Sequence, residues 1–115
     1  MKGILEEKSF QFSIRLIDLY RFLIEEKKEF IISKQMMRSG TSIGANIAEA
    51  KFAQSKADFI SKMTISLKEA SETRYWLRLL KATNTITEEQ FKDIIADCNE
   101  LINILVASCK SAKNI

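Results

Sequence analysis

The sequence predicts an all-α protein, and three observations lead to that prediction. The chain of 115 residues has no proline and only three glycines, so the turn formers on which sandwiches and barrels depend are scarce. Apolar side chains recur at alternating steps of three and four residues, which is the spacing of one helix face. A capping box formed by Thr87 and Gln90 marks the start of the last such stripe. Long uninterrupted helices are therefore expected.

The first helix is expected at about residues 9–28 and carries two apolar seams. One seam contains Phe10, Ile17, Tyr20 and Ile24, and the other contains Phe12, Leu16, Leu19 and Leu23. A monomeric bundle needs only one seam on each helix. The second seam therefore predicts burial against another subunit.

The second helix is expected at about residues 33–53 and contains the unusual stretch "RSGTSIGANIAEA". An inward stripe is formed by Met36, Gly40, Ile43, Ile47 and Ala50, with Gly44 beside it. A polar side is formed by Gln35, Arg38, Ser39, Ser42, Asn46 and Glu49. Each interior glycine costs about 0.5–1 kcal/mol relative to alanine, which predicts close approach of a neighbouring helix or subunit. The alternative is that the glycines mark a kink, or a break between two short helices.

The third helix is expected from a serine cap at Ser55 to about Lys81, before the polar turn "TNT". The fourth starts after Thr87, where Glu88 and Glu89 suit the positive end of the helix dipole. Four helices joined by short links predict one domain over residues 1–115, folded as an up-and-down antiparallel four-helix bundle.

Missing residue types argue against catalysis. The chain has no histidine, which removes the commonest general base and the commonest zinc ligand. No Walker loop, GxGxxG or CxxC motif occurs, so neither a nucleotide, a cofactor nor a metal is expected. Cys98 and Cys109 would be about 16 Å apart on one helix face, too far to bond, and are expected to be small buried groups. The protein is thus predicted to be non-enzymatic.

Neither a membrane span nor a secretory segment is expected. No apolar run is long enough for a bilayer, and the start "MKGILEEKSF" turns to charged residues early. The expected location is therefore the cytoplasm.

The net charge of +3 gives weak support to nucleic-acid binding. Candidate contacts to the backbone of RNA or DNA are Lys34, Arg38, Lys51, Lys56, Arg74, Arg78 and Lys81. Tyr75 and Trp76 are adjacent and point in different directions, which fits packing better than base stacking. As an alternative, these charges form a solvated face in which Lys68 pairs with Glu72. The polar row of Arg38, Ser42, Asn46 and Glu49 in the second helix is then an interhelical hydrogen-bond network that fixes register.

The segment "TSIGANIAEA" resembles the Ser-Ile-x-x-Asn-Ile-Ala-Glu-Gly signature of a four-helix bundle family, which includes proteins encoded within intervening sequences of bacterial 23S ribosomal RNA genes. The likeness extends to "QMMRSG" before it, to "AQSKADFISKMTISLKEASETRYWLRLL" after it and, more loosely, to "KSFQFSIRLIDLYRFL". It covers roughly residues 8–82. Two departures are Gly44, where the family often has proline, and Ala50, where it has glycine.

The resemblance implies a left-handed bundle that assembles as a ring-like homo-oligomer, commonly a pentamer, without known enzymatic activity. The family is similar to the accessory variability determinant of diversity-generating retroelements, a basic pentamer that binds nucleic acid and a reverse transcriptase. Signature and packing positions carried over to this chain are Gly40, Ser42, Ile43, Gly44, Asn46 and Glu49. The partners expected are other copies of the chain and RNA or DNA. The alternative is a scaffold that binds a protein partner and no nucleic acid.

Overall fold

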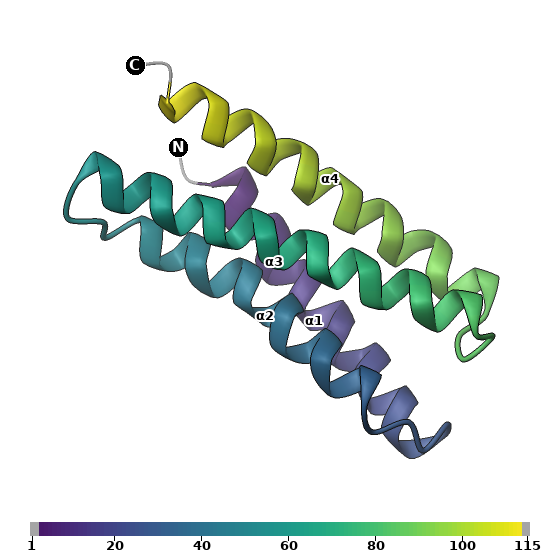
Figure 1. Cartoon of the computed structure of the whole chain (residues 1–115). Coiled ribbons are helices and arrows are strands. Elements are labelled where there is room, and N and C mark those ends of the chain that lie inside the picture. The colour runs from purple at the N-terminus through teal and green to yellow at the C-terminus, as the bar shows by residue number, and fades with distance from the viewer. Residues whose placement is uncertain (1–2, 114–115) are drawn as a thin grey trace.

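A computed structural model describes residues 3–113 of the chain, and within them it contains four helices and no strand. The helices are α1 (Ile4–Glu25), α2 (Ile32–Ala50), α3 (Lys56–Ala82) and α4 (Glu88–Lys113). Each packs against the next in sequence, and α4 closes the arrangement against α1. The short links reverse the chain direction, so the start of α1 and the end of α4 lie at the same end (Figure 1). The predicted up-and-down antiparallel four-helix bundle is confirmed.

Three helix boundaries differ from the predicted ones, and one of them is the end of α1, which lies at Glu25 instead of Lys28. Helix α1 begins at Ile4, five residues before the predicted start, and Gly3 precedes it in the left-handed conformation with φ of 57°, which glycine adopts without steric cost. Glu6 and Glu7 in its first turn favour this early start through the helix dipole. Helix α2 ends at Ala50 instead of Ala53, and the following backbone forms a turn.

The predicted caps of the last two helices are present. The Ser55 hydroxyl accepts a hydrogen bond from the amide of Asp58 at 3.0 Å. The amide of Thr87 donates to Gln90 Oε1 at 2.9 Å, and the amide of Gln90 donates to Thr87 Oγ1 at 3.1 Å. These reciprocal bonds form the capping box and satisfy amides that the helix itself leaves unpaired.

A different cap, not expected from the sequence, starts α2. The Glu29 carboxylate accepts hydrogen bonds from the amides of Ile31, Ile32 and Ser33 at 3.2, 2.9 and 2.6 Å. The Ser33 hydroxyl donates back to the Glu29 carbonyl at 2.6 Å. Partial burial works to raise the pKa of Glu29, but the bonds from these amides and from the Ser33 side chain outweigh it and lower the pKa. The ionised carboxylate is therefore the form that caps the helix.

Replacing this carboxylate, Glu29→Gln, should destabilise the bundle by about 1 kcal/mol at neutral pH, because the charge at the start of α2 is removed. A lowered folded-state pKa means that the contribution is fully present above the unfolded value of about 4.3 and is lost as the pH falls through the folded value. Urea unfolding of both proteins from about pH 7 to about pH 3 should show the difference shrinking in acid. A difference that stays constant over this range would show that the charge of Glu29 contributes nothing.

The core receives one apolar stripe from each helix, with smaller groups between them. Helix α1 contributes the seam of Phe12, Leu16, Leu19 and Leu23, which is buried. The other helices contribute the stripes that include Met36, Ile43 and Ile47 from α2, Met63, Ala70, Leu77 and Leu80 from α3, and Ile94, Cys98, Leu101 and Leu105 from α4. Both cysteines are buried and unbonded, as predicted. In the second seam of α1, Phe10 is 63% exposed within one chain, whereas Tyr20 packs against the core.

The two glycines of α2 lie within one continuous helix, so the alternative of a break between two short helices is wrong. A β-carbon on Gly40 would collide with Leu16 Cδ1 of α1 and lie 3.6 Å from Thr73 Cγ2 of α3. A β-carbon on Gly44 would meet Ser9 of α1 at 3.4 Å, which is an ordinary contact. Close helix approach thus explains Gly40, whereas Gly44 lies beside a more open space.

Candidate nucleic-acid interface

The structure disperses the seven predicted nucleic-acid contacts over several sides of the bundle. Three of them are paired with carboxylates on other segments: Arg38 with Glu72 at 2.7 Å, Lys51 with Glu6 at 3.4 Å and Lys81 with Glu88 at 3.2 Å. Arg74 donates a hydrogen bond to Asn99 Oδ1 at 3.1 Å. Lys34, Lys56 and Arg78 are exposed and form no ion pair within residues 3–113.

Ion pairs are distributed unevenly among the four helix–helix seams. The acids that hold neighbouring segments lie on the α1–α4, α1–α2 and α2–α3 seams: Glu100 and Asp97 with Lys8 and Arg15, Glu6 with Lys51, and Glu72 and Glu49 with Arg38 and Lys62. The α3–α4 seam has one ion pair, Lys81 with Glu88 at the turn between the helices. Its middle is joined by the hydrogen bond from Arg74 to Asn99, and the cations there have no ion-pair partner within residues 3–113.

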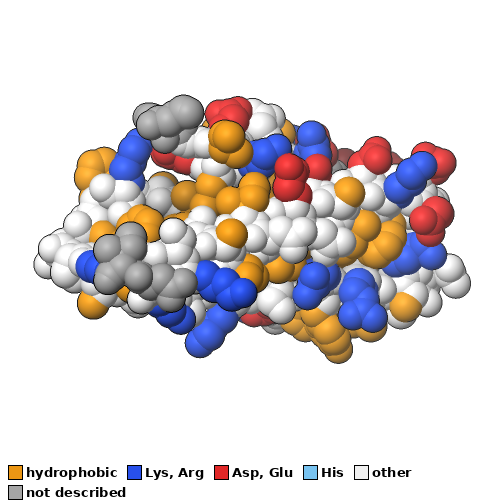
Figure 2. All heavy atoms as spheres, turned by 90° about the horizontal axis from the view of Figure 1, so that it is seen from above, with side chains coloured by type: hydrophobic (Ala, Val, Ile, Leu, Met, Phe, Trp, Pro, Cys, Tyr) orange, Lys and Arg blue, Asp and Glu red, His pale blue; other side chains and the backbone are white. Residues whose placement is uncertain are grey.

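These cations form a surface that we call the basic face: Lys68, Arg74 and Arg78 of α3, and Lys92, Lys110 and Lys113 of α4. All except the half-buried Arg74 are exposed, and none has an ion-pair partner in the described part of the chain. Figure 2 shows lysine and arginine side chains along one long edge of the molecule with few acidic side chains between them, whereas at the opposite edge they lie among most of the acidic side chains.

Sequence reasoning missed Lys68 and the three α4 cations of the basic face. Asn99 marks the side of α4 that meets α3, and Lys92 and Lys113 lie seven residues before it and fourteen after it, on the same stripe. This spacing was visible in the sequence, but the sequence did not show that this stripe of α4 lies beside α3. The expected pair between Lys68 and Glu72 is also wrong, because Glu72 contacts Arg38 and the Trp76 indole N–H.

Tyr75 lies on the outward side of α3, between the cations of the basic face. Its side chain is 56% exposed, so it is not packed as the sequence suggested. The neighbouring Trp76 ring meets it edge to face, with ring centroids 5.1 Å apart and planes at 72°. Trp76 is itself held by a 3.0 Å hydrogen bond from its indole nitrogen to Glu72. One aromatic ring is anchored, and the other is presented to solvent.

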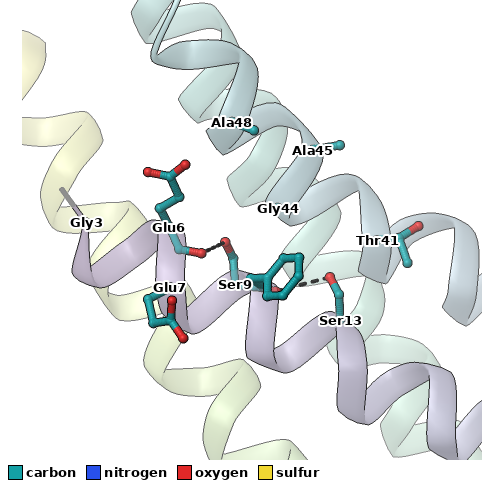
Figure 3. A pocket seen from close by; sticks show the side chains of 10 residues that line it. Gly3, Glu6, Glu7, Ser9, Ser13, Thr41, Gly44, Ala45 and Ala48 are labelled. Carbon is teal, nitrogen blue, oxygen red and sulfur yellow. Dashed lines mark hydrogen bonds between the residues drawn. The ribbon is translucent and has the colours of Figure 1, made fainter.

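A second surface feature is a groove of about 640 Å³ between α1 and α2. Its floor is made of small residues, with Ser9 and Ser13 from α1 facing Thr41, Gly44, Ala45 and Ala48 from α2 (Figure 3). Phe10 also lines the groove, and Ile14, one turn further along α1, is 42% exposed. The groove thus combines small residues from both helices with the exposed side chain of Phe10 from the second seam of α1.

Cys98 offers no reactive thiolate at neutral pH. Burial raises the pKa of the Cys98 thiol to about 12, although the nearby Arg74 charge acts in the opposite direction. Within residues 3–113, no group of three or more His, Cys, Asp or Glu side chains comes together that would suit a metal ion. None of the described helices is long and apolar enough to cross a membrane.

Comparison with known proteins identifies the family. The family model described as 23S rRNA-intervening sequence protein matches residues 3–107. The chain belongs to this family. A crystal structure of a protein of unknown function from the S23 ribosomal protein family of Bacteroides thetaiotaomicron VPI-5482 is 53% identical, covers 93% of this chain and 99% of its own, and superimposes with a TM-score of 0.92. Among curated proteins, none matches the chain.

The 23S rRNA-intervening sequence protein family was predicted from the segment in α2, and the structure shows what its signature residues do. Ile43 is buried, and its carbonyl accepts a 2.8 Å hydrogen bond from Ser66 of α3. Glu49 pairs with Lys62 of α3 at 2.9 Å. Ser42 and Asn46 instead donate to carbonyls of their own helix, those of Arg38 and Ser42. The predicted interhelical network is therefore confirmed only at the ends of the row, at Arg38 and Glu49.

One residue of the predicted polar side was placed wrongly. Ser39 is fully buried, and its hydroxyl lies 2.8 Å from Thr73 Oγ1 of α3. Together with Ser66, it provides the buried polar contacts between α2 and α3. Small hydroxyl groups at these positions let the two helices approach closely while their polar atoms stay satisfied. Polar side chains of this kind are expected at the surface, and only the fold shows that they form buried contacts between α2 and α3.

Proposed function

We propose that this member of the 23S rRNA-intervening sequence protein family is a non-enzymatic, oligomeric protein of the cytoplasm that binds the backbone of RNA or DNA through its basic face. The observation that carries the proposal is the uneven pairing of charge. Three seams neutralise their cations with acids, whereas the basic face leaves its cations available to phosphates. The family name adds a connection to RNA by description alone.

Assembly into a ring-like homo-oligomer, a pentamer as the family resemblance implies, is the second part of the proposal. The groove between α1 and α2, with exposed Phe10 in its lining and exposed Ile14 one turn further along α1, supports burial against a second copy of the chain. A ring would repeat the basic face on every subunit. The net charge of one subunit is only +3, but several subunits would then contact the same nucleic-acid strand, and affinity would rise through multivalency.

Reversing two cations of the basic face, Lys68→Glu with Arg78→Glu, should weaken binding at least about tenfold on all sequences alike, because phosphate contacts carry no base information. The slope of log affinity against log salt should flatten by about 0.7 for each phosphate of a single strand that the variant no longer neutralises. Filter-binding titrations of unspecific RNA at several salt concentrations measure both quantities.

The control makes the same change of charge elsewhere, Lys27→Glu with Lys28→Glu, in the link leading into α2. An equal reduction of affinity in the control would mean that net charge alone, and not the basic face, governs binding. Absence of wild-type binding at about 50 mM salt would contradict a nucleic-acid role and favour the scaffold for a protein partner.

A further inference from the structure

We infer that the basic face recognises single-stranded nucleic acid, with Tyr75 as a platform on which an unpaired base stacks. This inference rests on the proposed function and adds which form of nucleic acid is bound. It starts from the exposed phenol ring of Tyr75, which is 56% accessible although it lies on a helix whose other large aromatic, Trp76, is half-buried and hydrogen-bonded.

The surroundings of Tyr75 suit a nucleotide. Arg78 lies one turn after it and Lys68 two turns before it, so three exposed side chains follow one outward stripe of α3 over about 15 Å. Neither cation is held by an acid within residues 3–113. A base on the ring would therefore have a cation on each side for the phosphates of its neighbours.

The ring is also prepared for stacking. Trp76 meets Tyr75 edge to face at 5.1 Å, and the bond from Trp76 to Glu72 fixes the indole, which limits the orientations of the phenol. Glu72 is in turn held by Arg38 of α2 at 2.7 Å. A chain of contacts from α2 thus supports an aromatic ring whose outer side faces solvent. Stacking on such a ring tolerates any base, since every base has an aromatic face.

A single strand fits this surface better than a duplex. Helix α3 packs against both α2 and α4, so only its outward stripe is available to a ligand. In a duplex the base faces are covered by their neighbours, and a tyrosine on this stripe would reach the backbone only. Unpaired bases can turn outward and stack on an aromatic side chain while basic residues follow the phosphates.

The test compares the wild-type protein with Tyr75→Ala and Tyr75→Phe on three probes of equal length: oligouridylate RNA, oligothymidylate DNA and a blunt DNA duplex. Tyr75→Ala should bind both single strands at least about fivefold more weakly while binding the duplex as before. Tyr75→Phe should keep most of the affinity because the ring remains. Fluorescence of Trp76, the one tryptophan of the chain, should change on addition of single strands and not of duplex.

Each contrary result has a distinct meaning. Wild-type protein that binds none of the probes would overturn the proposed function itself. Wild-type binding that Tyr75→Ala leaves unchanged, or weakens equally on duplex, would overturn the stacking role and leave the basic face intact. Weaker binding confined to RNA and shared by Tyr75→Phe would replace stacking by a hydrogen bond from the phenol. A Tyr75→Ala protein with a changed sedimentation mass would assign Tyr75 to a subunit interface instead.

Discussion

Gly40→Leu should destabilise the bundle by about 3 kcal/mol or more, whereas Gly44→Leu should cost less than about 1 kcal/mol. At Gly40 even a β-carbon would meet the fully buried Leu16, and the rest of a leucine would have to displace core side chains. At Gly44 the nearest atoms belong to Ser9 at 3.4 Å, and the residue lines an open groove. The gain in helix propensity there offsets most of the steric cost.

Urea unfolding or thermal melting of both variants measures this difference, and Gly40→Leu should lower the melting temperature by more than about 10 °C. A double-mutant cycle tests the cause. In a Leu16→Ala background the cost of Gly40→Leu should shrink, because the side chain that it displaces has been shortened. Equal destabilisation at Gly40 and Gly44, or no coupling with Leu16, would contradict close packing of α1 against α2 at Gly40.

Phe10→Glu combined with Ile14→Glu should convert the assembly into single chains. The two side chains lie one turn apart on the exposed side of α1, and burying two carboxylates against a second copy would be strongly unfavourable. Sedimentation analysis should show the wild-type protein at a multiple of 13.2 kDa and the variant near 13.2 kDa. The isolated chain should keep its helical circular dichroism, because neither residue belongs to the core.

A matched control places two glutamates at exposed positions of α4, Ala96→Glu with Asn103→Glu, and should leave the mass unchanged. A wild-type mass near 13.2 kDa would remove the assembly from the proposed function. Dissociation of the control alone would place the subunit interface on α4 instead of in the α1–α2 groove.

The sequence was sufficient where a structural feature depends on residues close together in the chain. The capping box of Thr87 and Gln90 and the Ser55 cap each join residues three positions apart, so their hydrogen bonds could be predicted from residue type and spacing. The inward stripe of α2 followed from helical periodicity in the same way. The Glu29 cap was not predicted, because its carboxylate belongs to the link between α1 and α2, whose backbone path the sequence does not show.

The candidate site was harder to predict, since its character depends on which helices are neighbours. From the sequence, Arg38 and Lys51 were candidate contacts to phosphate, but in the fold Arg38 pairs with Glu72 and Lys51 pairs with Glu6. The sequence suggested that Lys68 pairs with Glu72, but in the fold Glu72 pairs with Arg38. Ser39 was predicted on the polar side of α2, but in the fold it is buried and its hydroxyl lies beside Thr73 of α3. In each case the deciding group lies tens of residues away, and helix periodicity gives a side chain's direction without naming what it meets.

The sequence alone predicts the four helices, their antiparallel order and the family. Helix propensity, capping and apolar periodicity are local properties of the chain, and short links leave few ways to connect the helices. The tertiary structure decided which charges remain free and which glycine is indispensable to packing. Charge pairing and close approach are properties of two surfaces, and the second surface exists only once α1, α2, α3 and α4 have come together.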